Sequence, residues 1–167
     1  TGNPSFIADP VNTASGSHVL EQTLLVINGA LPVTLKARYD SLLVNLGPMG
    51  KGWGHNFETA LEVLANKNVM IHWTANRQNT FINDGFNNYS STEIAIKLDH
   101  LVKNPDNSYT LTRKDGSILQ FNAAGKLTQQ ANRTGQLINL SYDSNNKLAT
   151  ITEPVSGKAL TFAYNTG

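Results

Sequence analysis

The chain has 167 residues, enough for one domain with a real hydrophobic core. Charged residues make up 15% of it, well below the ~25% usual for soluble domains, and the net charge is +1. No basic run is present to neutralise phosphates, so a nucleic-acid partner is not expected. The absence of cysteine excludes disulfides and thiolate zinc sites.

The longest apolar runs, near residues 24–27 and 42–44, are far too short to span a membrane. The sequence begins without an initiator methionine or a secretion signal, so we expect a fragment of a longer protein. Asn, Thr, Ser and Gln supply most of the polarity, a composition that favours β-sheet and turns over long surface helices.

In chain order, residues 1–17 are polar and predict an extended lead-in, and residues 18–27 predict a strand. Asn28-Gly29 follows between apolar runs, which predicts a type I′ hairpin turn because both positions of that turn need positive φ. The returning strand alternates cleanly. The side chains expected on its apolar face are Leu31, Val33, Leu35, Ala37 and Tyr39.

Two further alternating runs, 57–63 and 69–74, predict strands joined by a turn at 65–68. Asp84-Gly85 lies between two short apolar runs and predicts a second hairpin of the type I′ kind.

Residues 90–103 are ambiguous. An irregular linker leading into a strand near 98–102 is favoured, but Ser90 and Glu93 have capping-box spacing, so a short helix remains an alternative. A turn at 104–107 and a strand at 108–113 follow.

The C-terminal third of the chain repeats. Ser117–Phe121, Ile138–Tyr142 and Leu160–Tyr164 can be superposed, which places their aromatic ends in one column at spacings of 21 and 22 residues. After each of the first two aromatics come a polar turn and a Lys-Leu step, at 126–127 and 147–148. Such a period predicts hairpins stacked side by side, because a lone hairpin is marginal in water. The alternative is an ordinary meander of similar hairpins.

The same residues carry a family resemblance. Tyr142–Ile151 resembles the tyrosine–aspartate (YD) repeat of the Rhs family, in which Tyr-Asp is followed by a short turn, a basic residue, a leucine and a small-residue strand. Residues 9–16, 47–56 and 101–116 are similar to blocks that open the repeat region in bacterial Rhs proteins. The resemblance implies a wall of strands that encloses a toxic C-terminal domain in bacteria, or serves adhesion in the related teneurins. It also implies a bacterial secreted or cell-surface location.

The glycine block Gly47–Gly54 invites comparison with a phosphate loop. A phosphate loop needs Gly-Lys followed by Ser or Thr at the start of a helix, whereas here Gly52 follows Lys51 and a strand is expected next. We therefore interpret the block as a tight corner with positive φ values, in which Trp53 packs into the core and His55 donates a hydrogen bond.

No arrangement typical of an active site is apparent. The four histidines lack local ligand pairs, so no metal site or other cofactor is expected. Glu58 and Glu62 are expected to lie about 13 Å apart on a solvated strand face, and other acids at turns are expected to cap backbone amides. No Gly-x-Ser-x-Gly nucleophile motif is present, so catalysis is not expected.

These observations predict an all-β, antiparallel sheet of short hairpins forming one domain over 1–167, with an Rhs-type N-terminal region at 1–116 and YD-type repeats at 117–167. The residues assigned to its structural motifs are Gly47, Gly50, Gly52, Trp53, His55, Phe121, Gly125, Leu127, Gly135, Tyr142, Asp143, Leu148, Gly157 and Tyr164.

Three functions are open. The first is a non-enzymatic wall segment whose partner is the rest of its parent chain, with self-association through exposed sheet edges near 160–164. The second is a surface module that binds a glycan or a protein on another cell, with Trp53 and Trp73 as candidate glycan contacts. The third is a hydrolase domain.

Overall fold

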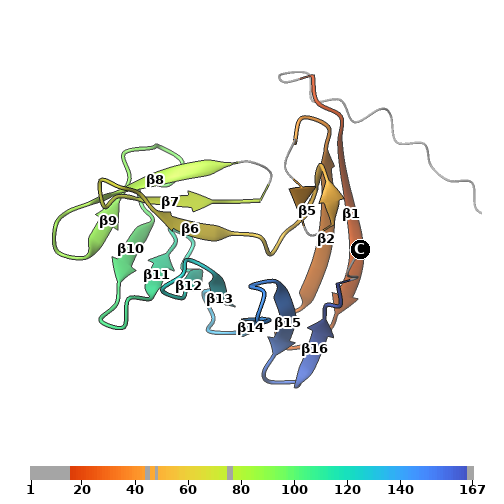
Figure 1. The fold of residues 1–167 in the computed structure, drawn as a ribbon. Helices are drawn as coiled ribbons and strands as arrows, with labels where there is room; N and C mark the ends of the chain where they lie inside the picture. Colours follow the sequence, from red (N-terminus) through yellow and green to blue (C-terminus); the bar gives the residue numbers. More distant parts are fainter. Residues whose placement is uncertain (1–15, 44–45, 48, 75–76, 165–167) are drawn as a thin grey trace, which may run out of the picture.

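A computed structural model describes residues 16–43, 46–47, 49–74 and 77–164. Within these ranges every regular element is a β-strand, and all strand pairs are antiparallel, which confirms the predicted fold class. The strands form a large sheet of 11 strands, a sheet of three and a two-stranded hairpin (Figure 1). No helix in the described part of the chain is long and apolar enough to cross a membrane.

The three-stranded sheet has the order β1 (Val19–Ile27), β2 (Val33–Asp40), β5 (Trp53–His55). The hairpin of β3 (Leu46–Gly47) and β4 (Gly50–Lys51) lies between β2 and β5 in the chain. Val33 and Ala37 are buried on the face predicted to be apolar, whereas β1 is exposed along most of its length.

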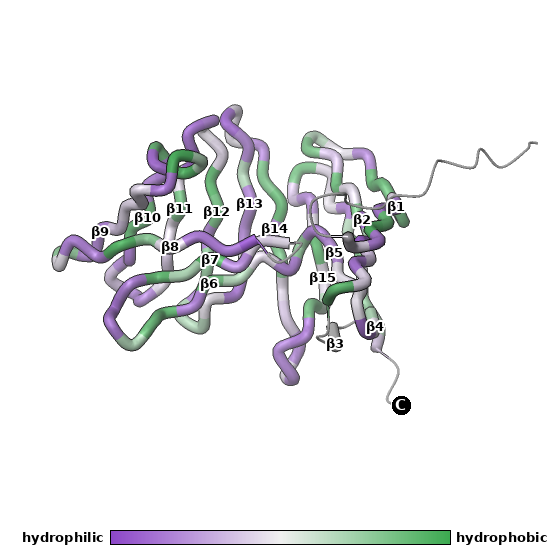
Figure 2. The backbone as a smooth tube through the Cα atoms, turned by 90° about the horizontal axis from the view of Figure 1, so that it is seen from above, coloured by the Kyte–Doolittle hydropathy of each residue, from purple (hydrophilic) through white to green (hydrophobic). Residues whose placement is uncertain are grey.

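The large sheet is a meander in strict chain order from β6 to β16. Its strands are β6 (Ala60–Val63), β7 (Val69–His72), β8 (Gln78–Asn83), β9 (Asn88–Ser90), β10 (His100–Lys103), β11 (Tyr109–Thr112), β12 (Ile118–Phe121), β13 (Leu127–Ala131), β14 (Leu137–Tyr142), β15 (Leu148–Glu153) and β16 (Lys158–Thr161). The sheet runs without interruption across residue 116, where the predicted N-terminal and repeat regions meet. Viewed from above, hydrophilic residues gather at the hairpin turns (Figure 2).

Six of the hairpin turns have the same backbone design. The first residue of each donates its N–H to the carbonyl of the fifth, and the N–H of the fourth returns to the carbonyl of the first. The fourth residue always has positive φ, and these residues are Lys67, Asn107, Gly116, Gly125, Gly135 and Asn146. This is a tight turn followed by a left-handed residue, a geometry that Gly and Asn adopt at low steric cost.

The two predicted type I′ turns are not found. Neither Asn28 nor Gly29 has positive φ, and the loop between β1 and β2 has five residues, because Ile27 pairs with Val33. At Asp84 the chain forms a hairpin, but the positive φ values fall at Gly85 and Asn87, with Asp84 accepting the N–H groups of Phe86 and Asn88. The hairpins were predicted correctly, and their turn types were wrong.

The loop between β1 and β2 is shaped by Glu153, at the end of β15. The Glu153 carboxylate is buried and accepts the N–H groups of Val155 and Ser156 at 2.9 and 2.8 Å, and also that of Ala30. A Cβ on Gly29 would lie 2.5 Å from Glu153 Oε2. Lys158 Nζ donates to Asn28 O at 2.9 Å from the same side. The loop is therefore bound to the large sheet, and Gly29 provides close approach rather than a left-handed turn.

Residues 91–99 form an irregular linker, as favoured above, and the helix alternative is wrong. Only Ile96 of its large apolar side chains is buried, while Ile94 and Leu98 are exposed. The following strand starts at His100 rather than near residue 98, and the last strand ends at Thr161 rather than at Tyr164.

The repeat register is periodic, as predicted. Phe121 pairs with Leu127 after an irregularity next to Gln120, and Tyr142 pairs with Leu148 after an irregularity next to Ser141. Each residue pair in the β12–β13 hairpin recurs in the β14–β15 hairpin with both residue numbers raised by 21, which is the spacing between the first two residues of the aromatic column. Equal hairpins therefore lie flank to flank in one sheet.

The large sheet curls until its first strand meets one of its own turns. Leu61 N–H donates to Gly125 O at 2.8 Å, and Ala60 forms an isolated bridge with Lys126. The buried side chains enclosed by this curl form one cluster that draws on almost every strand, with Phe81 and Phe121 its largest fully buried members. Val33 of β2 belongs to the cluster, and Leu35 of β2 and Leu31 of the preceding loop pack against it, so both sheets share one core.

We predict that Gly125→Ala destabilises the protein far more than Gly135→Ala. Both glycines have positive φ, near +80°, but a Cβ on Gly125 would lie 1.8 Å from Leu61 O, whereas Gly135 faces open space. The conformational cost alone is about 1 kcal/mol, and the clash at Gly125 raises the loss to at least about 3 kcal/mol. Urea unfolding of the two variants measures the difference. Equal losses would show that the curl onto Leu61 does not form.

Candidate functional site

The repeats are joined by a tyrosine hydroxyl. Tyr142 Oη donates to the carbonyl of Leu127 at 2.8 Å, and Tyr164 Oη donates to the carbonyl of Leu148 at 2.9 Å. Both leucines are buried and occupy the same place in the Lys-Leu step of the preceding repeat. The two tyrosines of the aromatic column therefore each bind the backbone one repeat earlier. We call this pair of contacts the repeat lock.

The lysine of the same step lies over the ring. Lys126 Nζ is 5.7 Å from the ring centroid of Tyr142, and Lys147 Nζ is 4.9 Å from that of Tyr164. These distances allow cation–π attraction. Burial, and secondarily Tyr164, raises the pKa of Tyr142 to about 12, so the hydroxyl keeps the proton that it donates. The sequence columns contained both partners of the lock, but the contact between them was not predicted.

The first aromatic of the column makes no lock, because Phe121 lacks a hydroxyl; it is fully buried instead. The other predicted motif residues shape turns. Asp143 accepts the N–H groups of Asn145 and Lys147 at 2.9 and 2.8 Å. Gly135 and Gly157 have positive φ and open surroundings.

The glycine block is the tight corner that was predicted. Gly50 and Gly52 have positive φ, and a Cβ on Gly52 would lie 2.8 Å from the ring of Tyr39. Gly47 is in β3, and the strand β5 rather than a helix follows the block. Trp53 is half-buried against Tyr39, with ring centroids 5.3 Å apart, and lies outside the main core, so its predicted core position is wrong.

The buried His55 and the half-buried Glu58 form a polar pair next to this corner. His55 Nδ1 accepts the N–H of Phe57 at 3.2 Å, whereas a donated hydrogen bond was predicted. Its Nε2 faces Glu58 Oε1 at 3.6 Å, and the ring stacks on Phe162 at 6.0 Å. Burial lowers the pKa of His55 to about 4 and raises that of Glu58. The prediction of a solvated Glu58 is therefore wrong, because its carboxylate is turned inward toward Gly54; Glu62 is exposed and pairs with His72 at 2.8 Å.

A pocket of about 300 Å³ opens where the loop between β1 and β2 meets the inner face of the large sheet. Its lining residues are Leu31, Thr59, Trp73, Arg113, Ser117, Leu119, Gln130, Ala131 and Asn132. Trp73, one of the two candidate glycan contacts, is in the pocket wall, and Trp53 is not.

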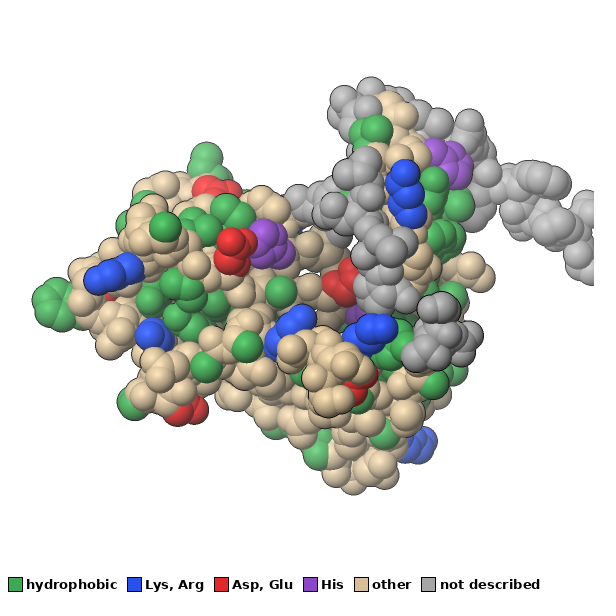
Figure 3. Space-filling model, in the orientation of Figure 1, with side chains coloured by type: hydrophobic (Ala, Val, Ile, Leu, Met, Phe, Trp, Pro, Cys, Tyr) green, Lys and Arg blue, Asp and Glu red, His purple; other side chains and the backbone are tan. Residues whose placement is uncertain are grey.

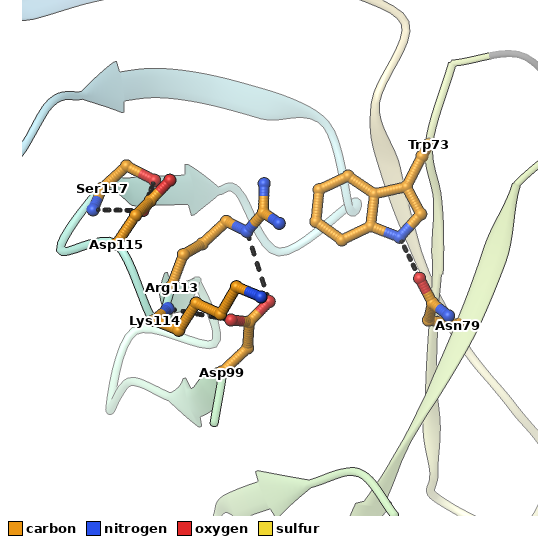
Figure 4. Close-up of polar contacts among 7 residues, drawn as sticks. All are labelled: Trp73, Asn79, Asp99, Arg113, Lys114, Asp115 and Ser117. Carbon is orange, nitrogen blue, oxygen red and sulfur yellow. Dashed lines mark hydrogen bonds and ion pairs between the residues drawn. The ribbon is translucent and has the colours of Figure 1, made fainter. Parts of the chain in front are cut away.

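Arg113 is held beside Trp73 by an acid. Arg113 Nε donates to Asp99 Oδ2 at 3.2 Å, while the backbone N–H of Lys114 donates to Asp99 Oδ1 at 2.9 Å (Figure 4). Trp73 Nε1 is turned away from Arg113 and donates to Asn79 Oδ1 at 2.7 Å. The guanidinium of Arg113 lies 4.9 Å from the indole centroid, and that of Arg77 lies 4.8 Å from it. Sequence reasoning missed both arginines, because Arg113 is far from Trp73 in the chain and Arg77, although nearby, belongs to no motif that was singled out.

The described residues contain no cluster of three or more His, Asp or Glu side chains that could hold a metal ion. On the face shown in Figure 3, lysine and arginine side chains are scattered among uncharged ones rather than gathered in a patch.

The fold is that of an antiparallel hairpin array with a small sheet docked on its inner face. Residues 8–81 match the family model described as a domain of unknown function, DUF6531. This match takes in the three-stranded sheet and the large sheet from β6 into β8, and it ends before the repeats at 117–164. No curated protein matches the chain.

We predict that folding stability falls as the pH drops from 6.5 toward 4 because of His55. Its pKa is about 6.5 in an unfolded chain and about 4 in the folded one, so its contribution is complete above pH 6.5 and is lost as the pH falls toward 4. The expected slope is up to about 1.4 kcal/mol per pH unit. The raised pKa of Glu58 acts in the opposite direction.

Urea unfolding at several pH values measures this slope. His55→Asn, whose side-chain oxygen can still accept the Phe57 N–H, should show a shallower slope, and Glu58 is present in both proteins. Parallel curves for the two proteins would contradict the assignment to His55.

We predict that Tyr142→Phe and Tyr164→Phe each lower the free energy of unfolding by about 1–2 kcal/mol, since each leaves a leucine carbonyl without its donor. Tyr39→Phe is the matched control, because its hydroxyl makes no hydrogen bond to another described residue and its loss should stay within about 0.5 kcal/mol. Chemical denaturation gives the three values. Equal losses at all three tyrosines would mean that the hydroxyl contacts do not join the repeats.

Proposed function

We propose that this chain is a non-enzymatic segment of a β-wall of the Rhs or YD-repeat type, which encloses or presents a further domain of its parent protein. The repeat lock carries the proposal. A contact that recurs between equivalent residues of successive repeats can be repeated along a wall of any length. A binding or catalytic site, by contrast, is usually formed at one place in a domain.

Three further features support a structural role. The hairpins share one turn design and one register, so each added unit meets the previous one through the same hydrogen bonds. Among the described strands, β16 is hydrogen-bonded to β15 alone, which suits continuation by further hairpins. The curl of the sheet gives it an inner and an outer face (Figure 1).

The Rhs-type part of the proposal rests on the sequence resemblance. That resemblance includes the blocks at 47–56 and 101–116 and the repeat at 142–151; the block at 9–16 falls almost wholly outside the described residues. The same proposal divides the chain into an N-terminal region at 1–116 and a repeat region at 117–167. It also includes a toxin or effector as the enclosed domain and a bacterial secreted or cell-surface location.

A second function, recognition of a ligand by a surface module, is favoured by the pocket at Trp73. The pocket combines an aromatic ring, a guanidinium and side-chain amides, a mixture that suits a small polar ligand. This function is compatible with a wall, since the pocket and the repeat lock use different residues.

The free edge of β16 gives a direct test. We predict that the isolated chain self-associates with rising concentration, because unpaired N–H and C=O groups on an edge strand recruit another strand. Sedimentation velocity measures the association. Thr161→Lys puts a charge on the exposed side of β16 and should weaken it; Thr112→Lys, on the inner strand β11, is the matched control and should not.

In the whole parent protein the same edge should be paired with the next hairpin, so electron cryo-microscopy of that protein should show the sheet continuing beyond β16. A monomeric isolated chain at high concentration, or a parent chain that turns away from β16, would refute the wall.

A further inference from the structure

The pocket at Trp73 contains a positioned guanidinium, that of Arg113, whose two terminal nitrogens donate to none of the described residues. Asp99, itself fully buried, engages Arg113 through Nε alone, and no other described residue accepts a hydrogen bond from the two terminal nitrogens of Arg113. The side chain of Arg113 is 27% exposed, so these nitrogens are accessible. A guanidinium held from behind in this way presents its planar fork to a ligand.

A second cation strengthens the preference for an anion. Arg77 and Arg113 both lie over the Trp73 ring, so their guanidinium carbons are at most 9.7 Å apart, the sum of their distances of 4.8 and 4.9 Å to the centroid. Three acids lie nearby, and each accepts hydrogen bonds. Asp115, whose charge also acts on Arg113, accepts the N–H and the Oγ–H of Ser117. Asp99 binds Arg113 and Lys114 N–H, and Glu93 accepts Asn79 Nδ2 and Thr80 N–H. Arg77 lies outside the pocket lining, but its positive charge also attracts an oxyanion bound to Arg113.

The other residues that line the pocket favour a small ligand that carries hydroxyl groups. Gln130 is half-buried and Thr59 is buried, and neither side chain makes a hydrogen bond to another described residue. Leu119, Ala131 and Leu31 supply apolar surface between them. A volume of about 300 Å³ is at the lower end for ligand pockets and fits one ring with substituents.

The indole itself is not a free stacking platform. Two guanidinium groups lie over it and its N–H is bound to Asn79. Recognition of a neutral sugar by stacking on Trp73 is thereby disfavoured, and the role of Trp73 is to hold the two cations through cation–π attraction.

We propose that this pocket binds an acidic monosaccharide unit, a hexuronate, with its carboxylate on the terminal nitrogens of Arg113 and its ring hydroxyls on Gln130 and Thr59. The inference is independent of the proposed wall function, since it uses neither the repeat lock nor the sheet edge.

The test is titration of the isolated chain with glucuronate, glucose and acetate, followed by the indole N–H resonance of Trp73 in NMR spectra and by calorimetry. Glucuronate should give a saturable shift of this resonance, and glucose and acetate should bind at least about tenfold more weakly, since each lacks one half of the ligand. Glucose binding as well as glucuronate would overturn the role of the carboxylate. Acetate binding as well would overturn the role of the sugar ring, and no saturable shift with glucuronate would overturn the site.

Two variants test the named contacts. Arg113→Lys keeps the charge but removes the planar fork, and should weaken glucuronate binding about tenfold; Gln130→Ala should weaken it by a smaller factor. Arg133→Lys is the matched control, because Arg133 is exposed in a turn outside the pocket. Thermal melting confirms that each variant is folded. Unchanged affinity in folded Arg113→Lys and Gln130→Ala would refute the assignment.

Discussion

The structure depends on one constraint: strands of only three to six residues in the large sheet are stable only when they pair with neighbouring strands. A short hairpin alone gains too little to offset its lost chain entropy, so each one needs its neighbours. The chain meets this constraint by joining most successive strands through turns of one fixed length. The left-handed residue in that turn decides where the next strand starts and which side chains face inward. Fixed turns thus impose a fixed register, and the register aligns the tyrosines and leucines of the repeat lock.

Two contacts convert the flat meander into a closed shape with an interior. The carbonyl of Gly125 accepts the N–H of Leu61, which brings the first strand of the sheet onto a turn much later in the chain. The carboxylate of Glu153 binds the loop that contains Gly29 and Ala30, and hydrogen bonds from Ser156 and nearby amides hold its pKa below the ordinary value. Both contacts use backbone groups at glycine-containing loops, where no side chain prevents close approach. The pocket at Trp73 lies between the parts that these contacts bring together.

Local periodicity was sufficient to predict the hairpins, because alternation of apolar side chains is a property of each strand by itself. The repeat columns were equally informative: Leu119 and Leu140 are both buried, and Phe121 and Tyr142 both pair with a leucine. Failures came where distant residues intervene. The turn at Asn28-Gly29 changes type because Glu153, far along the chain, binds its loop, and Glu58 is turned inward by contacts with Gly54 and His55.

The candidate site was predictable only in part, for the same reason. Trp73 was identified by its residue type, but its partners come from separate loops of the large sheet, Arg77 between β7 and β8 and Arg113 between β11 and β12, and no local spacing connects Arg113 to it. Trp53 was grouped with Trp73 on residue type alone, and the structure places it against Tyr39 instead. The tyrosine–leucine contact was readable in principle, since both columns were visible and a hydroxyl in a half-buried column must find an acceptor.

The shared register has a consequence for how such a chain can change in length. Loss of a whole two-strand unit would leave a tyrosine facing the leucine carbonyl of the next remaining unit, with a lysine still above its ring. Loss of an odd number of residues within a strand would instead move every later side chain to the opposite face. Length variation in this architecture is therefore quantised: it is tolerated in steps of about one hairpin pair or as small insertions at the turns, such as the extra residue before Tyr164.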